Sequence, residues 1–297
     1  MKTIYILSGV ARSGKSTYAK SLQGIIVSRD TIREHLFGDK SCINHEELVS
    51  AEFDKQFNKA LLGNENIIID NTNLKIKYVN HFIESAKKYK FNVEIIRFFV
   101  PLKTLYKRAK ESNFSIFVIN KMLKTNQMWK FEITFPKIKI TDIINEYVDI
   151  SEYYELMDFD QENPNHSHTL LVHSLLSEEY MSKECILNKE LSKDIGKIHD
   201  LGKVLAKEYD ETKKIYRYTG HDIASWYLSR TVKNIPKFKS YLALLHMHHF
   251  NIDNGMSKQK YWDKINKYHE LCKDEISYDN FIYLLSLLEN ADTKSSK

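Results

Sequence analysis

The segment GVARSGKST (9–17) combines the residue types that hold a nucleoside triphosphate. It matches GxxxxGK[ST], follows an apolar strand-like run and precedes a helical pattern, which is the context this motif requires. The glycines let backbone N–H groups face the phosphates, Lys15 reaches the β- and γ-phosphates, and the Ser16 hydroxyl ligates Mg²⁺. The predicted ligand is ATP or another nucleoside triphosphate with Mg²⁺, and the predicted contacts are Gly9, Arg12, Ser13, Gly14, Lys15, Ser16 and Thr17.

A second polar group, SRDTIREHLFG (28–38), follows the next strand-like run. In a parallel sheet the carboxyl ends of the strands line the ligand crevice. Asp30 is therefore placed to accept a proton from an attacking hydroxyl, and Arg33, one helical turn later, to hold a phosphate of the acceptor. The alternative interpretation makes Asp30 a helix N-cap, a role that Asp often fills.

A different chemistry is indicated by GKIHDLGK (196–203), in which a His and an Asp follow a run of apolar positions. Apolar spacing also places His173 and Asp292 on buried helix faces, and buried polar groups need partners. Four N and O ligands of this kind suit a divalent transition metal, which activates water for attack on a phosphate ester. Mn, Fe, Co, Ni and Zn all remain candidates, and the alternative is a set of core histidines without a metal.

The elements that carry these residues differ between the two halves of the chain. In the first half, strand-like runs at 3–7, 24–28, 66–70 and 93–100 alternate with helical patterns such as 46–62. This alternation predicts an α/β domain whose parallel sheet is covered by helices on both faces. From about residue 165 onward the pattern is helical, with almost no strand signal. The break at 151–167 predicts two domains, 1–150 and 157–297.

Length and composition limit the remaining possibilities. A chain of 297 residues fits two ordinary domains. The net charge of +5 comes from the first half, which suits a nucleic-acid partner or, equally, a solvated lysine-rich surface. Three dispersed cysteines, no signal peptide and no long apolar run predict a cytoplasmic protein without membrane association. The oligomeric state is not predicted.

The first half resembles the phage and bacterial polynucleotide 5′-hydroxyl kinases over about residues 1–135. The resemblance rests on the phosphate loop, on RDTIR (29–33) and on DNTN (70–73). It implies that Asp30 is the general base and that Arg33 holds a phosphate of the acceptor strand. The lid of that family presents two arginines, whereas YKRAKES (106–112) keeps Arg108 and has Ser112 one turn later. Lys110 and Lys121 are the candidates for the missing charge.

The second half resembles the HD-domain metal-dependent phosphohydrolases over about residues 160–297, because their H…HD…D order is repeated here. The resemblance implies an all-α fold with His173, His199, Asp200 and Asp292 as metal ligands. Asp200 would also orient the attacking water. His221 and His248 are implied as ligands of a second metal or of the substrate phosphate, with His246 and His249 as alternatives to His248.

Together the two sites predict an enzyme that heals broken RNA or DNA ends. One site would phosphorylate a 5′-hydroxyl, and the other would remove a 3′-phosphate or a 2′,3′-cyclic phosphate. The sequence contains no KxDG ligase motif, so joining would need a separate nucleic-acid ligase. Two alternatives remain open: a nucleoside or small-molecule kinase fused to an HD nucleotidase or phosphodiesterase, and a nucleic-acid-binding module whose HD half is inactive.

Overall fold

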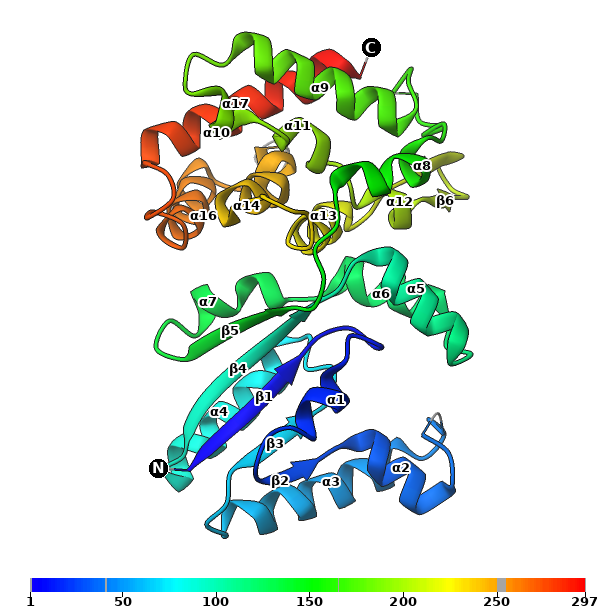
Figure 1. Cartoon of the computed structure of the whole chain (residues 1–297), viewed down its shortest axis with the longest axis vertical. Coiled ribbons are helices and arrows are strands. Elements are labelled where there is room, and N and C mark those ends of the chain that lie inside the picture. The colour runs from blue at the N-terminus through cyan, green and yellow to red at the C-terminus, as the bar shows by residue number, and fades with distance from the viewer. Residues whose placement is uncertain (1, 41, 165, 250–254, 297) are drawn as a thin grey trace. The chain divides into compact units, whose positions relative to one another are not determined.

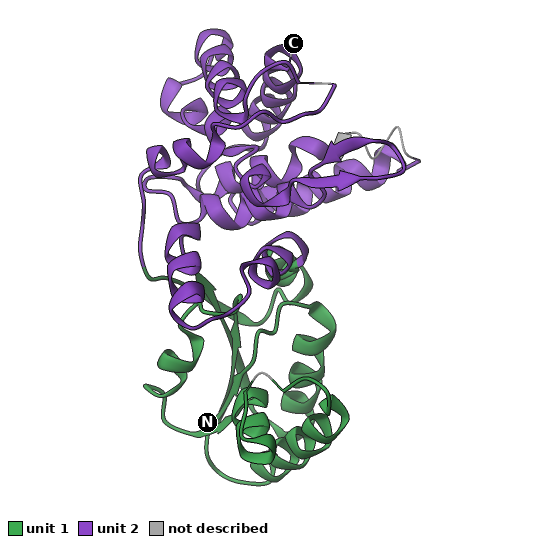
Figure 2. Cartoon of the chain, turned by 90° about the vertical axis from the view of Figure 1, so that its right-hand side faces the viewer, with its two compact units in different colours: residues 1–99, 126–145 green, residues 100–125, 146–297 purple. Residues whose placement is uncertain are grey.

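The computed structural model describes residues 2–40, 42–164, 166–249 and 255–296, with only the backbone described at 248–249. It divides into two compact units (Figure 2): unit 1 contains 1–99 and 126–145, and unit 2 contains 100–125 and 146–297. The units differ from the predicted domains in two ways. Residues 100–125 pack with the helical half, and the division falls after residue 145 instead of within 151–167. The domains 1–150 and 157–297 stay a prediction about which segments fold and act alone.

Unit 1 is a parallel α/β structure, as the alternating pattern predicts (Figure 1). Within the described residues its five strands are all parallel, in the order β2-β3-β1-β4-β5. The predicted strands are all present, whereas β5 was not predicted, because its mixed polar sequence KITDII belongs to an edge strand. The elements are β1 Thr3–Ser8, α1 Lys15–Ala19, β2 Ile25–Val27, α2 Arg29–Phe37, α3 Glu46–Leu61, β3 Ile67–Asp70, α4 Ile76–Tyr89, β4 Asn92–Phe99, η1 Met128–Lys130, α7 Phe131–Thr134 and β5 Lys139–Ile144.

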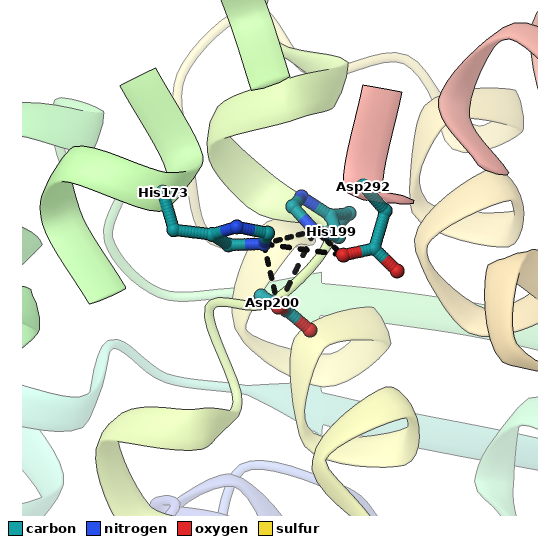
Figure 3. Close-up of side chains that lie close together, drawn as sticks. All are labelled: His173, His199, Asp200 and Asp292. Carbon is teal, nitrogen blue, oxygen red and sulfur yellow. Dashed lines mark hydrogen bonds and ion pairs between the residues drawn. The ribbon is translucent and has the colours of Figure 1, made fainter. Parts of the chain in front are cut away.

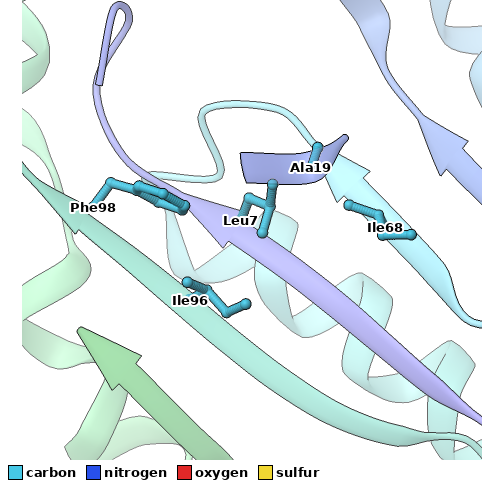
Figure 4. Packing of buried hydrophobic residues seen from close by; sticks show 5 residues of the cluster. All are labelled: Leu7, Ala19, Ile68, Ile96 and Phe98. Carbon is cyan, nitrogen blue, oxygen red and sulfur yellow. The ribbon is translucent and has the colours of Figure 1, made fainter. Parts of the chain in front are cut away.

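The core of unit 1 lies on both faces of this sheet. On one face α1 packs against the central strands through Ala19, which contacts a cluster formed by Leu7, Ile68, Ile96 and Phe98 (Figure 4). Burial of these apolar side chains stabilises the sheet and holds α1, whose first turn contains the end of the phosphate loop, against it. The predicted stripe of helix 46–62 is confirmed, because Phe53, Phe57 and Leu61 are buried on α3.

Unit 2 is mainly helical, but β6 and β7 form an antiparallel hairpin that the all-α prediction missed. No helix among the described residues is long and apolar enough to cross a membrane. The elements are α5 Leu102–Glu111, α6 Ile116–Thr125, η2 Ile150–Tyr153, α8 Tyr154–Met157, α9 Leu170–Glu184, α10 Lys189–Ser192, α11 Ile195–Ile198, α12 Lys203–Ala206, β6 Glu208–Asp210, β7 Ile215–Arg217, α13 His221–Ser229, α14 Lys237–Leu245, η3 His246–His249, α16 Lys258–Glu270 and α17 Tyr278–Ser295.

The apolar stripe that leads to His199 does not lie on one helix, because the chain turns between α10 and α11. Asp194 adopts a left-handed conformation there, with φ 64°. Gly196 then packs so closely on α9 that a Cβ atom would lie 2.3 Å from the backbone N of Glu178. The Glu178 carboxylate accepts hydrogen bonds from the backbone N–H groups of Asp194 and Gly196. This buried contact orients the next residues, His199 and Asp200.

Candidate functional sites

The phosphate loop (residues 9–17) connects β1 to α1 and is shaped by its backbone. Gly14 has φ 94°, and a Cβ atom on Gly9 would lie 2.8 Å from Ser13 Oγ, so neither position accepts a side chain easily. The Lys15 ammonium is buried and donates to the Val10 carbonyl at 2.8 Å. Burial lowers the pKa of Lys15 to about 8, although the carboxylates of Asp70 and Asp30 oppose that shift. A curled loop with a poorly solvated cation fits a polyphosphate ligand.

Asp70 is a site residue that the sequence analysis noted only as part of DNTN. It ends β3, is 9% exposed and accepts a hydrogen bond from the Ser16 hydroxyl. Burial raises the pKa of Asp70, and the Ser16 hydrogen bond and the Lys15 charge partly oppose this rise. A loop serine beside a strand-end aspartate is the pair that holds Mg²⁺ in P-loop enzymes. The residues present therefore fit ATP with Mg²⁺.

Asp30 is not the N-cap of α2, so that alternative interpretation is wrong. Ser28 caps the helix and accepts from the Thr31 N–H, whereas the Asp30 side chain is 68% exposed. Asp30 forms an ion pair with Arg33 at 2.6 Å, so the two residues predicted to serve the acceptor lie together. Asp30 is accessible to a substrate hydroxyl, as a general base must be.

Glu46, at the first turn of α3, is an unpredicted partner in this group. Its carboxylate accepts from Arg33 Nε at 2.6 Å and lies 3.2 Å from Arg29 Nη1. The hydrogen bond from Arg33 lowers the pKa of Glu46, and the same contact raises the pKa of Arg33. Glu46 therefore holds the Nε edge of Arg33 and leaves the Nη1 edge turned toward Asp30.

The predicted lid residues lie on α5 and α6, within unit 2. Arg108 is partly buried on α5, while Lys110 and Lys121 are exposed. Ser112 is the C-cap of α5, and its hydroxyl donates to the Arg108 carbonyl at 2.7 Å. Ser112 therefore ends the helix, and the contact of Arg108, Lys110 or Lys121 with nucleotide phosphates stays a prediction.

The second site is a cluster of His173, His199, Asp200 and Asp292, called the His/Asp cluster below (Figure 3). His173 comes from α9, His199 and Asp200 follow α11, and Asp292 comes from α17. The His173 Nε2 atom lies 3.2 Å from Asp200 Oδ2, 3.2 Å from Asp292 Oδ1 and 3.3 Å from His199 Nε2. The structure thus brings together all four residues that the H…HD…D pattern singled out.

The histidine rings are oriented by hydrogen bonds on their far side. The Nδ1 atoms of His199, His221 and His246 lie 2.7 Å from the carbonyls of Gly196, Tyr218 and Ala243. His173 differs, because its Nδ1 contacts the Ser295 hydroxyl at 3.1 Å, and Ser295 in turn donates to the Ala291 carbonyl. A hydrogen bond at Nδ1 leaves the Nε2 lone pair pointing inward, which is the arrangement of metal-ligating histidines.

A second ligand group shares Asp200 with His221 and His246. The Nε2 atoms of these histidines lie 3.2 and 3.6 Å from Asp200 Oδ1. Of the three histidines that were weighed for this position, His246 is placed here, and the side chains of His248 and His249 lie outside the described residues. Among the described residues, His221 Nε2 and both Asp200 oxygens are buried without a well-aligned hydrogen bond, which is a reason to expect a cation between them.

Lys203 is a further residue that the sequence analysis did not single out. Its ammonium is buried, lies 2.6 Å from Asp200 Oδ2 and donates to Gln161 Oε1 at 3.0 Å. The "HDLGK" spacing contained the signal, since a lysine three residues after Asp200 lies one helical turn away. Lys203 places a positive charge beside the Asp200 carboxylate.

The charges of the His/Asp cluster favour a bound cation. Burial alone would lower the pKa of His199, but the Asp200 and Asp292 carboxylates outweigh it and raise this pKa to about 10. Burial disfavours the ionised form of both carboxyls, yet neighbouring cationic groups keep their pKa values below the usual range. The carboxylates that draw a proton to His199 would equally attract a metal ion in place of that proton, and imidazole nitrogens with carboxylate oxygens suit a transition metal. The residues therefore fit the predicted ion.

The family match includes the phosphate loop and ends before the His/Asp cluster. Residues 4–119 match the AAA_33 family, an AAA domain. A "Putative bifunctional polynucleotide kinase/RNA ligase" of Autographa californica nuclear polyhedrosis virus is 31% identical over 122 residues. The match covers 36% of this chain and 18% of the viral protein. The N-terminal part is thus a P-loop kinase-type domain related to part of a polynucleotide kinase/ligase.

Solved structures give weaker similarity. A chain of the Pnkp1/Rnl/Hen1 complex is 28% identical over 36% of this chain and 38% of that chain, with a TM-score of 0.33. A gluconokinase from Sinorhizobium meliloti 1021 is 15% identical over 48% of this chain and 82% of its own, also with a TM-score of 0.33. Scores this low establish no common architecture for the whole chain.

Proposed function

We propose that this chain heals nucleic-acid ends, with unit 1 as a 5′-hydroxyl kinase and unit 2 as a metal-dependent 3′-phosphohydrolase. The observation that carries the proposal is the presence of a buried His/Asp cluster in the same chain as a kinase-type domain related to a polynucleotide kinase/ligase. The substrates are RNA or DNA strands with a 5′-hydroxyl and a 3′-phosphate or 2′,3′-cyclic phosphate.

In the kinase step the phosphate loop and Lys15 hold the β- and γ-phosphates, and Ser16 with Asp70 holds Mg²⁺. Asp30, which is exposed at the first turn of α2, accepts the proton of the 5′-hydroxyl as that oxygen attacks the γ-phosphorus. Arg33, whose Nε edge is held by Glu46, exchanges its Nη1 contact with Asp30 for a phosphate of the acceptor strand. Positioning and charge stabilisation supply most of the rate in such transfers.

In the hydrolytic step a divalent transition ion held by His173, His199, Asp200 and Asp292 supplies Lewis acidity and a lowered water pKa. Asp200 orients the attacking water, and Lys203 places its ammonium beside the phosphate oxygens. His221 and His246 share Asp200, and this group binds either a second ion or a phosphate oxygen. The ring orientations set at the Nδ1 atoms keep the Nε2 atoms directed at the reacting groups.

A separate nucleic-acid ligase is the proposed partner. The viral relative is described as both a kinase and an RNA ligase, whereas these 297 residues contain no KxDG motif. A protein that repairs both ends but joins neither would pass its product to such an enzyme.

The decisive experiment is end-group analysis of an RNA with a 5′-hydroxyl and a 3′-phosphate, and of its DNA analogue. The full chain is incubated with ATP, Mg²⁺ and one transition metal at a time. Lys15→Ala should lose only the 5′ phosphorylation, and Asp292→Asn only the 3′ dephosphorylation. Gain of a 5′-phosphate without loss of the 3′-phosphate would reduce the protein to a kinase. Phosphorylation of nucleosides but not of strands would favour the small-molecule alternative.

A further inference from the structure

The β6–β7 hairpin is inserted between residues of the second site. It begins five residues after Lys203 and ends four residues before His221. Figure 1 shows β6 beside α12 at the edge of the helical unit. Because Lys203 and His221 both contact Asp200, the chain enters and leaves the hairpin close to the second site.

Four aromatic side chains and one lysine lie along the base of this hairpin. Tyr209 and Tyr216 meet edge to face at 5.1 Å, and the Lys207 ammonium lies 4.5 Å from the Tyr216 ring and 5.2 Å from Phe159. Phe159 in turn stacks on Tyr218 at 6.4 Å. We call these five residues the hairpin strip: Phe159, Lys207, Tyr209, Tyr216 and Tyr218.

The hairpin strip is physically continuous with the second site. The Tyr218 hydroxyl donates to the Gln161 carbonyl at 2.7 Å, and Lys203 donates to the Gln161 side chain at 3.0 Å. Lys203 also lies 5.5 Å from the Tyr218 ring and 2.6 Å from Asp200 Oδ2. The strip therefore runs from the exposed Tyr209, 47% accessible, to the buried carboxylate of the cluster.

The turn of the hairpin adds positive charge on a rigid support. Asp210 Oδ1 accepts from the backbone N–H groups of Thr212 and Lys213, which fixes the turn, and Lys213 and Lys214 are exposed there. Two neighbouring acidic side chains are engaged within the chain, Asp210 with Arg217 and Glu208 with Lys124. Glu211 is exposed beside Lys213 and Lys214, so the exposed side chains of the turn carry one net positive charge.

We propose that the hairpin strip binds the single-stranded nucleotides that precede the 3′ end, so that the terminal phosphate enters the His/Asp cluster. This inference rests on the proposed function of unit 2. Aromatic rings beside lysines are the chemistry that binds single strands, because each base offers a face for stacking and each nucleotide a phosphate. The strip supplies the rings, and the exposed Lys213 and Lys214 supply the charge, since Lys207 is paired with Glu162 at 2.6 Å. A longer strand contacts more of the strip than a mononucleotide does, so the hairpin selects polynucleotide ends over free nucleotides.

The first test compares kcat/KM for a hexanucleotide 3′-phosphate with that for a nucleoside 3′-monophosphate. Tyr209→Ala should lower the ratio of the two values about tenfold, because loss of one stacking contact affects only the longer substrate. Lys213→Gln with Lys214→Gln should flatten the salt dependence of hexanucleotide KM. Tyr78→Ala, which removes a 52% exposed tyrosine from unit 1, is the matched control and should leave the ratio unchanged. A ratio that is equal in wild type and Tyr209→Ala overturns the proposal.

A second test needs no hydrolysis and so separates this inference from the proposed activity. A hexaribonucleotide with a 3′-hydroxyl and 4-thiouridine next to its 3′ end is cross-linked to the full chain by light. Adducts should form on residues 207–218 and disappear in Tyr209→Ala. If the protein cross-links at these residues but releases no 3′-phosphate, the result supports nucleotide binding by the hairpin strip and contradicts the proposed phosphatase activity. Adducts confined to other segments would overturn the strip even if hydrolysis is observed.

Discussion

The phosphate loop of unit 1 and the His/Asp cluster of unit 2 are built in opposite ways. The loop uses backbone N–H groups of one contiguous stretch, and its shape depends on two glycines and a strand-to-helix junction. The cluster uses side chains from α9, the segment after α11, and α17, which are separated by up to 119 residues of sequence from His173 to Asp292. A local motif tolerates changes elsewhere, whereas a cluster requires that several helices pack correctly.

The two sites also have opposite electrostatic character. In unit 1 burial leaves a cation poorly solvated and lowers the pKa of Lys15 to about 8. In unit 2 carboxylates raise the pKa of His199 to about 10. The first site therefore suits a polyanion and the second a cation, as expected for a nucleotide site and a metal site.

The largest effect is expected for Asp200→Ala. It removes the carboxylate shared by both ligand groups, so hydrolysis of 3′-phosphate should fall at least about 10³-fold, a loss of about 4 kcal/mol in transition-state stabilisation. Kinase activity measured on the same preparation should stay within twofold. Because an unpaired Lys203 is left behind, a thermal melt and a metal-content measurement must accompany the assay. If hydrolysis is unchanged in Asp200→Ala and the wild-type protein contains no metal, the His/Asp cluster does not catalyse this reaction.

Asp30→Ala should have the next largest effect, and only in unit 1. Loss of a general base lowers transfer by about 100-fold or more, while the phosphate loop and its ATP affinity stay intact. The rate of phosphate transfer is measured with γ-labelled ATP and a 5′-hydroxyl oligonucleotide. The ATP affinity of the same variant is measured by titration. Asp39→Ala provides a control on an exposed aspartate that follows α2. Near-normal transfer by Asp30→Ala would limit Asp30 to its ion pair with Arg33.

Ser295→Ala should weaken the second site without deleting a ligand. Its hydroxyl contacts His173 Nδ1 and donates to the Ala291 carbonyl, so its loss leaves the ring less well oriented. Partners of this kind change metal affinity by about 10- to 100-fold. Competition with a chelator measures that affinity directly. Ser240→Ala, which alters another buried serine of unit 2, is the control and should leave the metal affinity unchanged. Equal metal affinities in wild type and Ser295→Ala would contradict a positioning role for Ser295.

The smallest effect is a pH dependence of ATP binding. The unliganded Lys15 loses its proton near pH 8, and bound phosphates favour its charged form, so binding above pH 8 must take up a proton. The dissociation constant should therefore rise about tenfold between pH 7 and pH 9. Calorimetry in two buffers of different ionisation enthalpy measures both the constant and the proton uptake. An ATP affinity that does not change with pH, without proton uptake, would show that burial does not lower the pKa of Lys15.

The sequence determined the parts of this protein that depend on short-range spacing. The phosphate loop, the strands at its flanks and the buried stripe of α3 are encoded within single segments, so periodicity and motif context sufficed. The four residues of the His/Asp cluster were also found from apolar spacing and order. The prediction that these four residues bind one metal came from the resemblance to HD-domain proteins. Spacing shows which face of a helix a residue occupies, but not which other helix that face contacts.

Tertiary structure decided the contacts between distant segments. No repeating pattern within one segment connects the residues of three such contacts. They are Asp70 with Ser16, Glu46 with Arg33, and His246 with Asp200. The hairpin of β6 and β7 has strands of three residues, which are too short to give a period-two signal. The sequence analysis assigned residues 100–125 to the first domain, but in the structure they belong to unit 2. Sequence shows that a helix has an apolar face to bury, but only the folded chain decides which element covers it.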